Sequence, residues 1–111
     1  MIKRTIEGSL FREMLLTGAA CLEKNKQAID AMNVFPVPDG DTGTNMSMTM
    51  QRAVAEIRQV KSDSVEELAS ALSMGALRGA RGNSGVILSQ IFRGFSRALK
   101  GSKNELDARL L

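Results

Sequence analysis

The chain of 111 residues contains no histidine, tryptophan or tyrosine, and its only cysteine is Cys21. With no histidine and a single thiol, it cannot assemble the His/Cys ligand set of an ordinary zinc site. A serine nucleophile would also have no imidazole base beside it. Cys21 lies next to Leu22 in a segment with helical spacing of apolar residues, where we expect a small buried thiol. Zinc chemistry of the His/Cys type and hydrolysis of the Ser-His type are therefore excluded.

Strong charge of one sign and long hydrophobic runs are also absent. The 15 Lys and Arg alternate with 12 Asp and Glu, which leaves a net charge of +3, and no basic run is interleaved with aromatics, so nucleic acid is not an expected partner. No stretch approaches the ~20 apolar residues of a membrane span, and the first residues do not form a signal segment. We expect one globular cytoplasmic domain over residues 1–111, without an internal boundary or a membrane span.

Both prolines, Pro36 and Pro38, fall in residues 33–45, which read N-V-F-P-V-P-D-G-D-T-G-T-N. This constrained loop places Asp39 and Asp41 one residue apart. Two such carboxylates repel each other unless one takes up a proton or a cation lies between them. Oxygen ligands suit Mg²⁺ or Ca²⁺. The loop therefore indicates a site for a hard divalent ion.

Two other interpretations of this loop are open to test. A calcium loop of the EF-hand type would need different residues at Gly43, Thr44 and Met50, so it fails at three positions. A solvated turn in which an aspartate caps the next helix remains an alternative.

Apolar residues at helical spacing predict four helices, over residues 9–32, over 44–60, from a capping box at Ser64 and Glu67, and around residues 86–99. Asp30 is expected at the surface. Residues 104–111 have the pattern of the start of a fifth helix. The residues expected to face inward are Phe11, Met14, Leu15, Gly18, Leu22, Ile29 and Met32, then Met46, Met50, Ala53, Val54 and Ile57, then Val65, Leu68, Leu72 and Ala76, and finally Val86, Ile87, Ile91, Phe95 and Leu99.

Two segments are candidates for binding phosphate. Thr42, Thr44 and Asn45 lie at the start of the second helix, where free backbone N–H groups and the positive end of the helix dipole favour anions. Residues 79–85, G-A-R-G-N-S-G, precede the fourth helix and add the Ser84 hydroxyl and the Arg81 guanidinium. The segment fits neither a Walker loop nor a Rossmann fingerprint. Close helix packing through small residues is the alternative.

Residues 33–46 together with residues 79–90, G-A-R-G-N-S-G-V-I-L-S-Q, resemble the nucleotide-binding domain of the dihydroxyacetone kinase L-subunit family, also described as Dak phosphatase or DegV-associated. Within it, the chain most closely resembles the N-terminal domain of the bacterial fatty acid kinase A branch. The resemblance implies an all-α barrel of antiparallel helices that binds ATP or ADP through Mg²⁺ at one end. The chain would form the N-terminal half, and is then either a fragment or a product that self-associates, for example as a homodimer.

The resemblance also assigns roles to residues. Asp39 and Asp41 would be metal ligands. The family's third aspartate is replaced by Val34, so Asn33, or less readily Asp30, would substitute for it. Apart from the resemblance, phosphoryl transfer needs charge neutralisation, and we expect the Arg81 guanidinium to supply it and thus serve catalysis. The residues that would line the nucleotide are Thr42, Gly43, Thr44 and Asn45 in the first motif, and Gly82, Asn83, Ser84 and Gly85 in the second.

The expected activity is that of a kinase in the context of its full-length protein, with little or none in the isolated 111 residues. The fatty acid kinase A branch implies transfer of phosphate to a fatty acid carboxylate held by a separate lipid-binding protein, in phospholipid metabolism. One alternative is a glycerone (dihydroxyacetone) kinase-like domain acting on a small ketose. Another is an inactive nucleotide-binding or scaffold fragment.

Overall fold

The computed structural model describes residues 5–32, 40–100 and 105–107. Four helices occupy most of the described chain and confirm the all-α class. A short antiparallel ribbon of two strands accompanies them, in which Thr5 pairs with Asp107 and Glu7 with Glu105. In chain order the elements are β1 (Thr5–Glu7), α1 (Gly8–Ala31), α2 (Thr42–Gln59), α3 (Val65–Arg78), α4 (Gly82–Ala98) and β2 (Glu105–Asp107).

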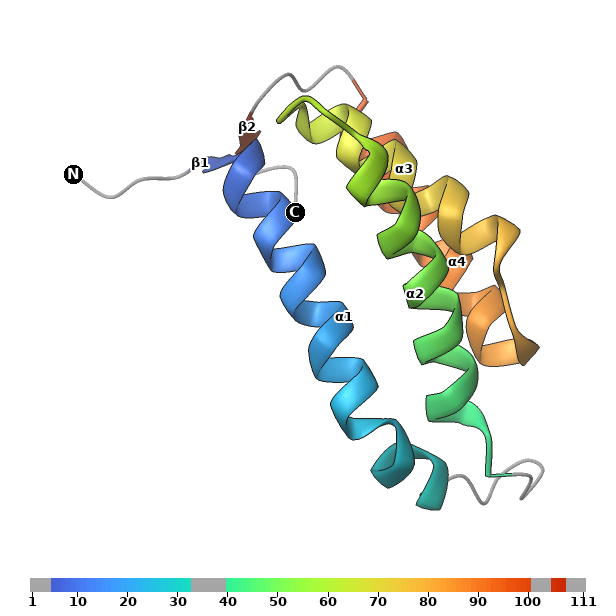
Figure 1. Cartoon of the computed structure of the whole chain (residues 1–111). Coiled ribbons are helices and arrows are strands. Elements are labelled where there is room, and N and C mark those ends of the chain that lie inside the picture. The colour runs from blue at the N-terminus through green and yellow to red at the C-terminus, as the bar shows by residue number, and fades with distance from the viewer. Residues whose placement is uncertain (1–4, 33–39, 101–104, 108–111) are drawn as a thin grey trace.

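The helices run up and down, with consecutive helices antiparallel and packed on each other (Figure 1). As a result α2 and α4 point the same way and also contact each other. Their N-termini lie toward the end of the molecule that holds the C-terminus of α1, whereas β1 and β2 lie at the opposite end. No helix in the described part of the chain is both long and apolar enough to cross a membrane.

The core lies where α2 and α3 pack together and where α1 and α4 cover them. All four residues expected to face inward in α3 are at most 1% exposed, and Ala53 and Ile57 of α2 are fully buried. The rings of Phe11 and Phe95 join α1 to α4 with centroids 5.9 Å apart. Burying a large apolar side chain contributes about 1.5–3 kcal/mol, so these contacts hold the bundle together.

Several boundaries differ from the sequence-based expectations. The α4 helix begins at Gly82, so Gly82 to Gly85 form its first turn instead of a loop before it. Residues 105–107 form a strand, which corrects the expected fifth helix there. Their backbone groups pair with β1, and this tertiary contact outweighs the local helical pattern. Residues 104 and 108–111 lie outside the described residues.

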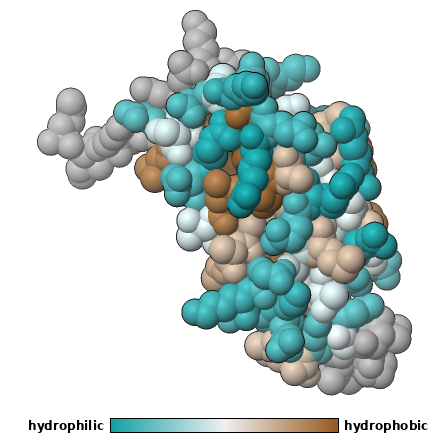
Figure 2. Space-filling view, viewed as in Figure 1, coloured by the Kyte–Doolittle hydropathy of each residue, from teal (hydrophilic) through white to brown (hydrophobic). Residues whose placement is uncertain are grey.

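Some apolar side chains expected in the core are exposed. Val86, Ile87 and Ile91 of α4 are 50%, 61% and 60% exposed. Met14 and Met32 are also exposed, and so is Cys21, which was expected to be buried. Periodicity identifies an apolar helix face, but it does not say whether another element covers that face. In Figure 2, hydrophobic atoms show mainly along the seam between α1 and α2, among polar side chains.

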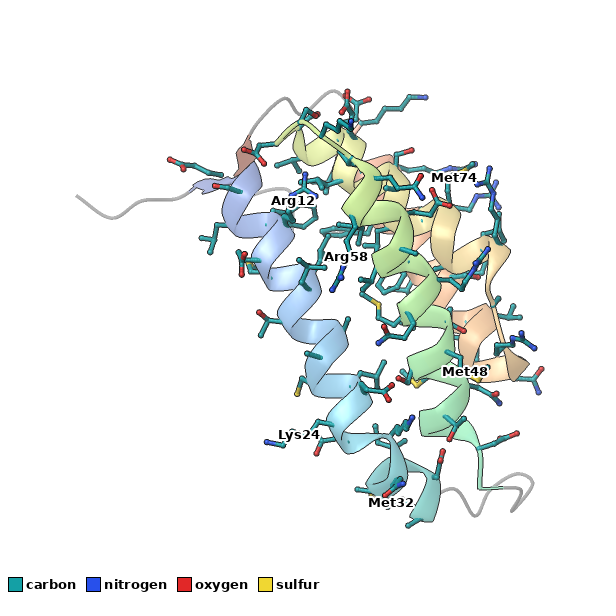
Figure 3. The ribbon with its side chains drawn as sticks, in the orientation of Figure 1. Arg12, Lys24, Met32, Met48, Arg58 and Met74 are labelled. Carbon is teal, nitrogen blue, oxygen red and sulfur yellow. The ribbon has the colours of Figure 1, made fainter. Side chains whose placement is uncertain are left out.

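Arg12, a residue that the sequence patterns do not single out, ties α1 to the end of α2. Its guanidinium donates to three carbonyl oxygens, those of Ile57 at 2.9 Å, Val60 at 2.7 Å and Ser62 at 2.9 Å. Figure 3 shows Arg12 directed from α1 toward α2. The last carbonyls of a helix have no partner within the helix and carry partial negative charge. Arg12 therefore caps α2 from a neighbouring helix.

Candidate functional site

The structure brings the two predicted phosphate-binding segments together. The Ser84 hydroxyl of α4 donates to the carbonyl oxygen of Thr42 in α2 at 3.4 Å. The Asn45 side chain lies against Gly82, where an added Cβ would be 2.4 Å from Asn45 Nδ2. Gly82 has a φ of 64°, a left-handed conformation that glycine adopts without strain. Two segments about forty positions apart in the sequence thus form one local cluster.

Thr49 fixes the turn that leads into α4, and sequence reasoning missed it. Its fully buried hydroxyl donates to the Asn45 carbonyl at 2.8 Å and accepts the Arg81 backbone N–H at 3.0 Å. A Cβ at Gly85 would be 2.4 Å from Thr49 Oγ1, so this glycine permits the close approach of α4 to α2. The only sequence signal is the position of Thr49 one helical turn after Asn45.

The N-terminus of α2 is already capped by α1. Asp30, expected at the surface, is half-buried, and its carboxylate accepts from the Thr44 backbone N–H at 2.9 Å and from the Thr44 hydroxyl. The hydroxyl bond, followed by the backbone bonds from Thr44 and Gly43, lowers the pKa of Asp30 below its ordinary value of 3.8. Gly43 also packs tightly, since a Cβ there would be 2.2 Å from the Lys26 carbonyl oxygen. Backbone N–H groups in this turn therefore serve the protein itself.

The N-terminus of α4 is open by contrast. Gly85 N–H donates to the Arg81 carbonyl at 3.0 Å, as in an ordinary first helical turn. Within residues 5–32, 40–100 and 105–107, the amides of Gly82, Asn83 and Ser84 have no acceptor. Asn83 and the Arg81 side chain are exposed, and Ser84 is half-buried. These free donors, at the positive end of a helix dipole, can bind an anion.

The predicted metal ligands are only partly within the described chain. Asp41 occupies the N-cap position of α2, and its carbonyl accepts from Asn45 N at 2.8 Å. Asp39 and Asn33, together with Val34, lie outside the described residues. Among the residues that are described, no group of three or more His, Cys, Asp or Glu side chains gathers in a way that suits a metal ion. Asp41 supplies carboxylate oxygen, the ligand type that fits Mg²⁺.

Comparison with known proteins identifies the class of domain. A family model for the DAK2 domain matches residues 36–111. This chain belongs to that family, the dihydroxyacetone kinase L-subunit-like domains. The match contains both predicted phosphate-binding segments, residues 42–45 and 79–85.

Individual relatives are similar over nearly the whole chain. Protein YloV of Bacillus subtilis strain 168 is 55% identical over 105 residues, covering 95% of this chain. Uncharacterized proteins of Staphylococcus aureus strains USA300 and NCTC 8325 are 49% identical over 106 residues, or 96% of the chain. The chain spans 19% of the length of each of these relatives.

Proposed function

We propose that these residues form the phosphate-binding part of a Mg²⁺-dependent ATP or ADP site in a kinase. The observation that carries the proposal is the joined pair of helix N-termini, in which Ser84 of α4 contacts Thr42 of α2 while the first amides of α4 stay open. A phosphate at Gly82, Asn83 and Ser84 would receive backbone N–H bonds and the favourable end of the α4 dipole. Thr49 would hold that turn in place.

The residues of the site would have different roles. Asp39, Asp41 and Asn33 would hold Mg²⁺, which when bound neutralises phosphate charge and orients the phosphoryl group. Asn45 would position Gly82, and Gly43 would let α2 pack closely on α1. Thr44, whose N–H and hydroxyl are engaged by Asp30, would fix the loop instead of donating to phosphate through its backbone. The exposed guanidinium of Arg81 would stabilise the transferring group.

For the acceptor, we propose a fatty acid carboxylate presented by a separate lipid-binding protein, with the whole kinase acting in the cytoplasm, as a homodimer if it self-associates. The support is the resemblance of residues 33–46 to the fatty acid kinase A branch and the replacement of the third aspartate by Val34. A small ketose such as dihydroxyacetone is the second candidate, favoured by the family to which the chain belongs.

Calorimetric titration of the full-length protein with Mg²⁺ and ADP tests the nucleotide site. Asp41→Ala should abolish Mg²⁺-dependent binding, because it removes charge from the metal side. Ser84→Ala should weaken binding by only about 1–2 kcal/mol, because the backbone amides remain. Ser70→Ala, at an exposed position on α3, is the control. Unchanged ADP affinity in Asp41→Ala and Ser84→Ala would refute the site.

The acceptor is tested separately. The full-length protein is supplied with ATP and Mg²⁺, and with either a fatty acid on its carrier protein or dihydroxyacetone with its binding subunit. Phosphate transfer to the carboxylate is expected. Transfer to the ketone alone would overturn the fatty acid proposal and leave the nucleotide site intact. If both acceptors stay unmodified while ADP binds, the domain is a nucleotide-binding module without turnover on these acceptors.

A further inference from the structure

A second cationic feature lies beside the cluster just described. An open cleft of ≈ 350 Å³ is lined by Arg52 of α2, Arg78 at the end of α3, and residues Gly79, Ala80 and Arg81 of the turn into α4. Three of its five lining residues are arginines. Guanidinium groups match the oxygens of phosphate and carboxylate in a forked, bidentate arrangement. The cleft therefore has the chemistry of an anion site.

The charge of the cleft is only partly compensated. Arg78 Nη1 lies 3.5 Å from Glu56 Oε1, so one guanidinium has a carboxylate partner. In the described chain, neither Arg52 nor Arg81 forms an ion pair or a side-chain hydrogen bond. With Glu56 counted, the cleft carries two uncompensated positive charges. Two positive charges match a phosphate dianion better than a single carboxylate.

The base of the cleft is tightly packed, because Gly79 lies against the stem of Arg52. A Cβ at Gly79 would be 2.2 Å from Arg52 Cγ and 2.4 Å from Arg52 Cβ. The Arg81 backbone is anchored to Thr49 at 3.0 Å. The stem of Arg52 and the backbone of Arg81 are therefore held in place by packing and by a buried hydroxyl.

The cleft lies beside the first turn of α4 and shares Arg81 with it, but Arg52 and Arg78 come from α2 and the end of α3. Three residues along one face of α2 contact the turn into α4 one after another. Asn45 contacts Gly82, Thr49 contacts Arg81, and Arg52 contacts Gly79. From Asn45 to Arg52 the helix rises seven residues, or about 10 Å. We infer that the cleft of Arg52, Arg78 and Arg81 is a second anion site, which binds a phosphate monoester or inorganic phosphate beside the nucleotide site.

The test is equilibrium dialysis of the full-length protein with labelled inorganic phosphate, at constant ionic strength, with Mg²⁺–ADP present in excess. Saturable phosphate binding is expected to remain under these conditions. Arg52→Gln should weaken it at least about tenfold, the size of one lost charge-assisted bond. Arg52→Lys, which keeps the charge and most of the stem, should show an intermediate loss because an ammonium group has no fork.

Arg58→Gln is the matched control, since Arg58 lies on the same helix but points toward α1 (Figure 3) and does not line the cleft. Phosphate affinity in this variant should equal that of the unmodified protein. A parallel titration with phenyl phosphate separates a monoester from free phosphate as the preferred ligand, and either result supports the site.

Two results would overturn the inference. One is the absence of saturable phosphate binding, or equal binding by Arg52→Gln and the unmodified protein. The other is a parallel loss of ADP affinity in Arg52→Gln, because the cleft would then belong to the nucleotide site. Titration of phosphate without ADP keeps the test valid if the protein binds no nucleotide, so a failure of the proposed function is distinguishable from a failure here.

Discussion

Replacing Arg12 with methionine tests how the hairpin of α1 and α2 is held. Methionine keeps an apolar stem of similar length but removes the guanidinium that donates to Ile57, Val60 and Ser62. Bonds to a charged donor contribute about 1.5–3 kcal/mol each when they are protected from water. The bonds to Ile57 and Val60 are partly buried and the one to Ser62 is exposed. We expect a total loss of about 3 kcal/mol, close to the lower value for the two protected bonds.

Urea denaturation followed by far-ultraviolet circular dichroism measures this loss. A thermal scan gives a second measurement of the same loss. With an unfolding entropy of about 2.1 cal/mol/K per residue, a loss of about 3 kcal/mol lowers the melting temperature of a domain of this size by about 13 °C. The ion pair of Arg12 with Asp63 is 3.9 Å long, and the Asp63 side chain is 61% exposed, so it adds little. The loss should therefore persist at high salt.

Two further variants test whether the loss of stability comes from the guanidinium of Arg12. Arg12→Lys keeps the charge but offers one nitrogen in place of a fork, so it should recover only part of the stability. Arg93→Met, at an exposed arginine of α4, should change stability by less than about 0.5 kcal/mol. If Arg12→Met costs less than about 1 kcal/mol, or if Arg12→Lys equals the unmodified protein, the capping account is wrong.

Three other changes test the packing around the site. Thr49→Val keeps the shape but leaves the Arg81 N–H without its acceptor, so unfolding free energy should fall by about 1–3 kcal/mol in chemical denaturation. Gly85→Val should disturb the α2–α4 contact and melt earlier than Gly94→Val, because only Gly85 has a neighbour within Cβ contact. Asp30→Asn should destabilise the protein above pH 4, where the native carboxylate is charged. The loss of stability should shrink as the pH falls through the lowered pKa of Asp30, because the native carboxylate then becomes protonated. A difference in stability that does not depend on pH would contradict this.

The sequence was sufficient to predict the helices and the core of α3. Val65, Leu68, Leu72 and Ala76 share one face, and that face is buried. The Ser64 cap is also present, since Ser64 Oγ accepts from Glu67 N at 3.3 Å. Helical periodicity and capping are local properties of the chain, so they can be read without the fold.

The contacts between elements were not predictable in the same way. In the expected capping box, the Glu67 carboxylate would return to Ser64, but it accepts from Ser62 instead. Asp30 and Arg12 were not recognised as caps of α2, because each acts on a different helix. Thr49 has no motif at all. These roles depend on which helices pack together, and the sequence pattern of one helix does not contain that information. The assignments of all the candidate site residues, Asp39, Asn33 and Arg81 among them, remain predictions.

The capping of α2 by Asp30 has a consequence for the order of folding. A helix that carries its own N-cap can form its first turn alone, whereas the first turn of α2 receives its carboxylate from the last turn of α1. That turn should become stable only when the hairpin of α1 and α2 closes. Since Asn45 and Thr49 then position the start of α4, the candidate site should assemble late and cooperatively. In a peptide covering residues 40–59 alone, amide hydrogen exchange at Gly43 and Thr44 should be nearly unprotected.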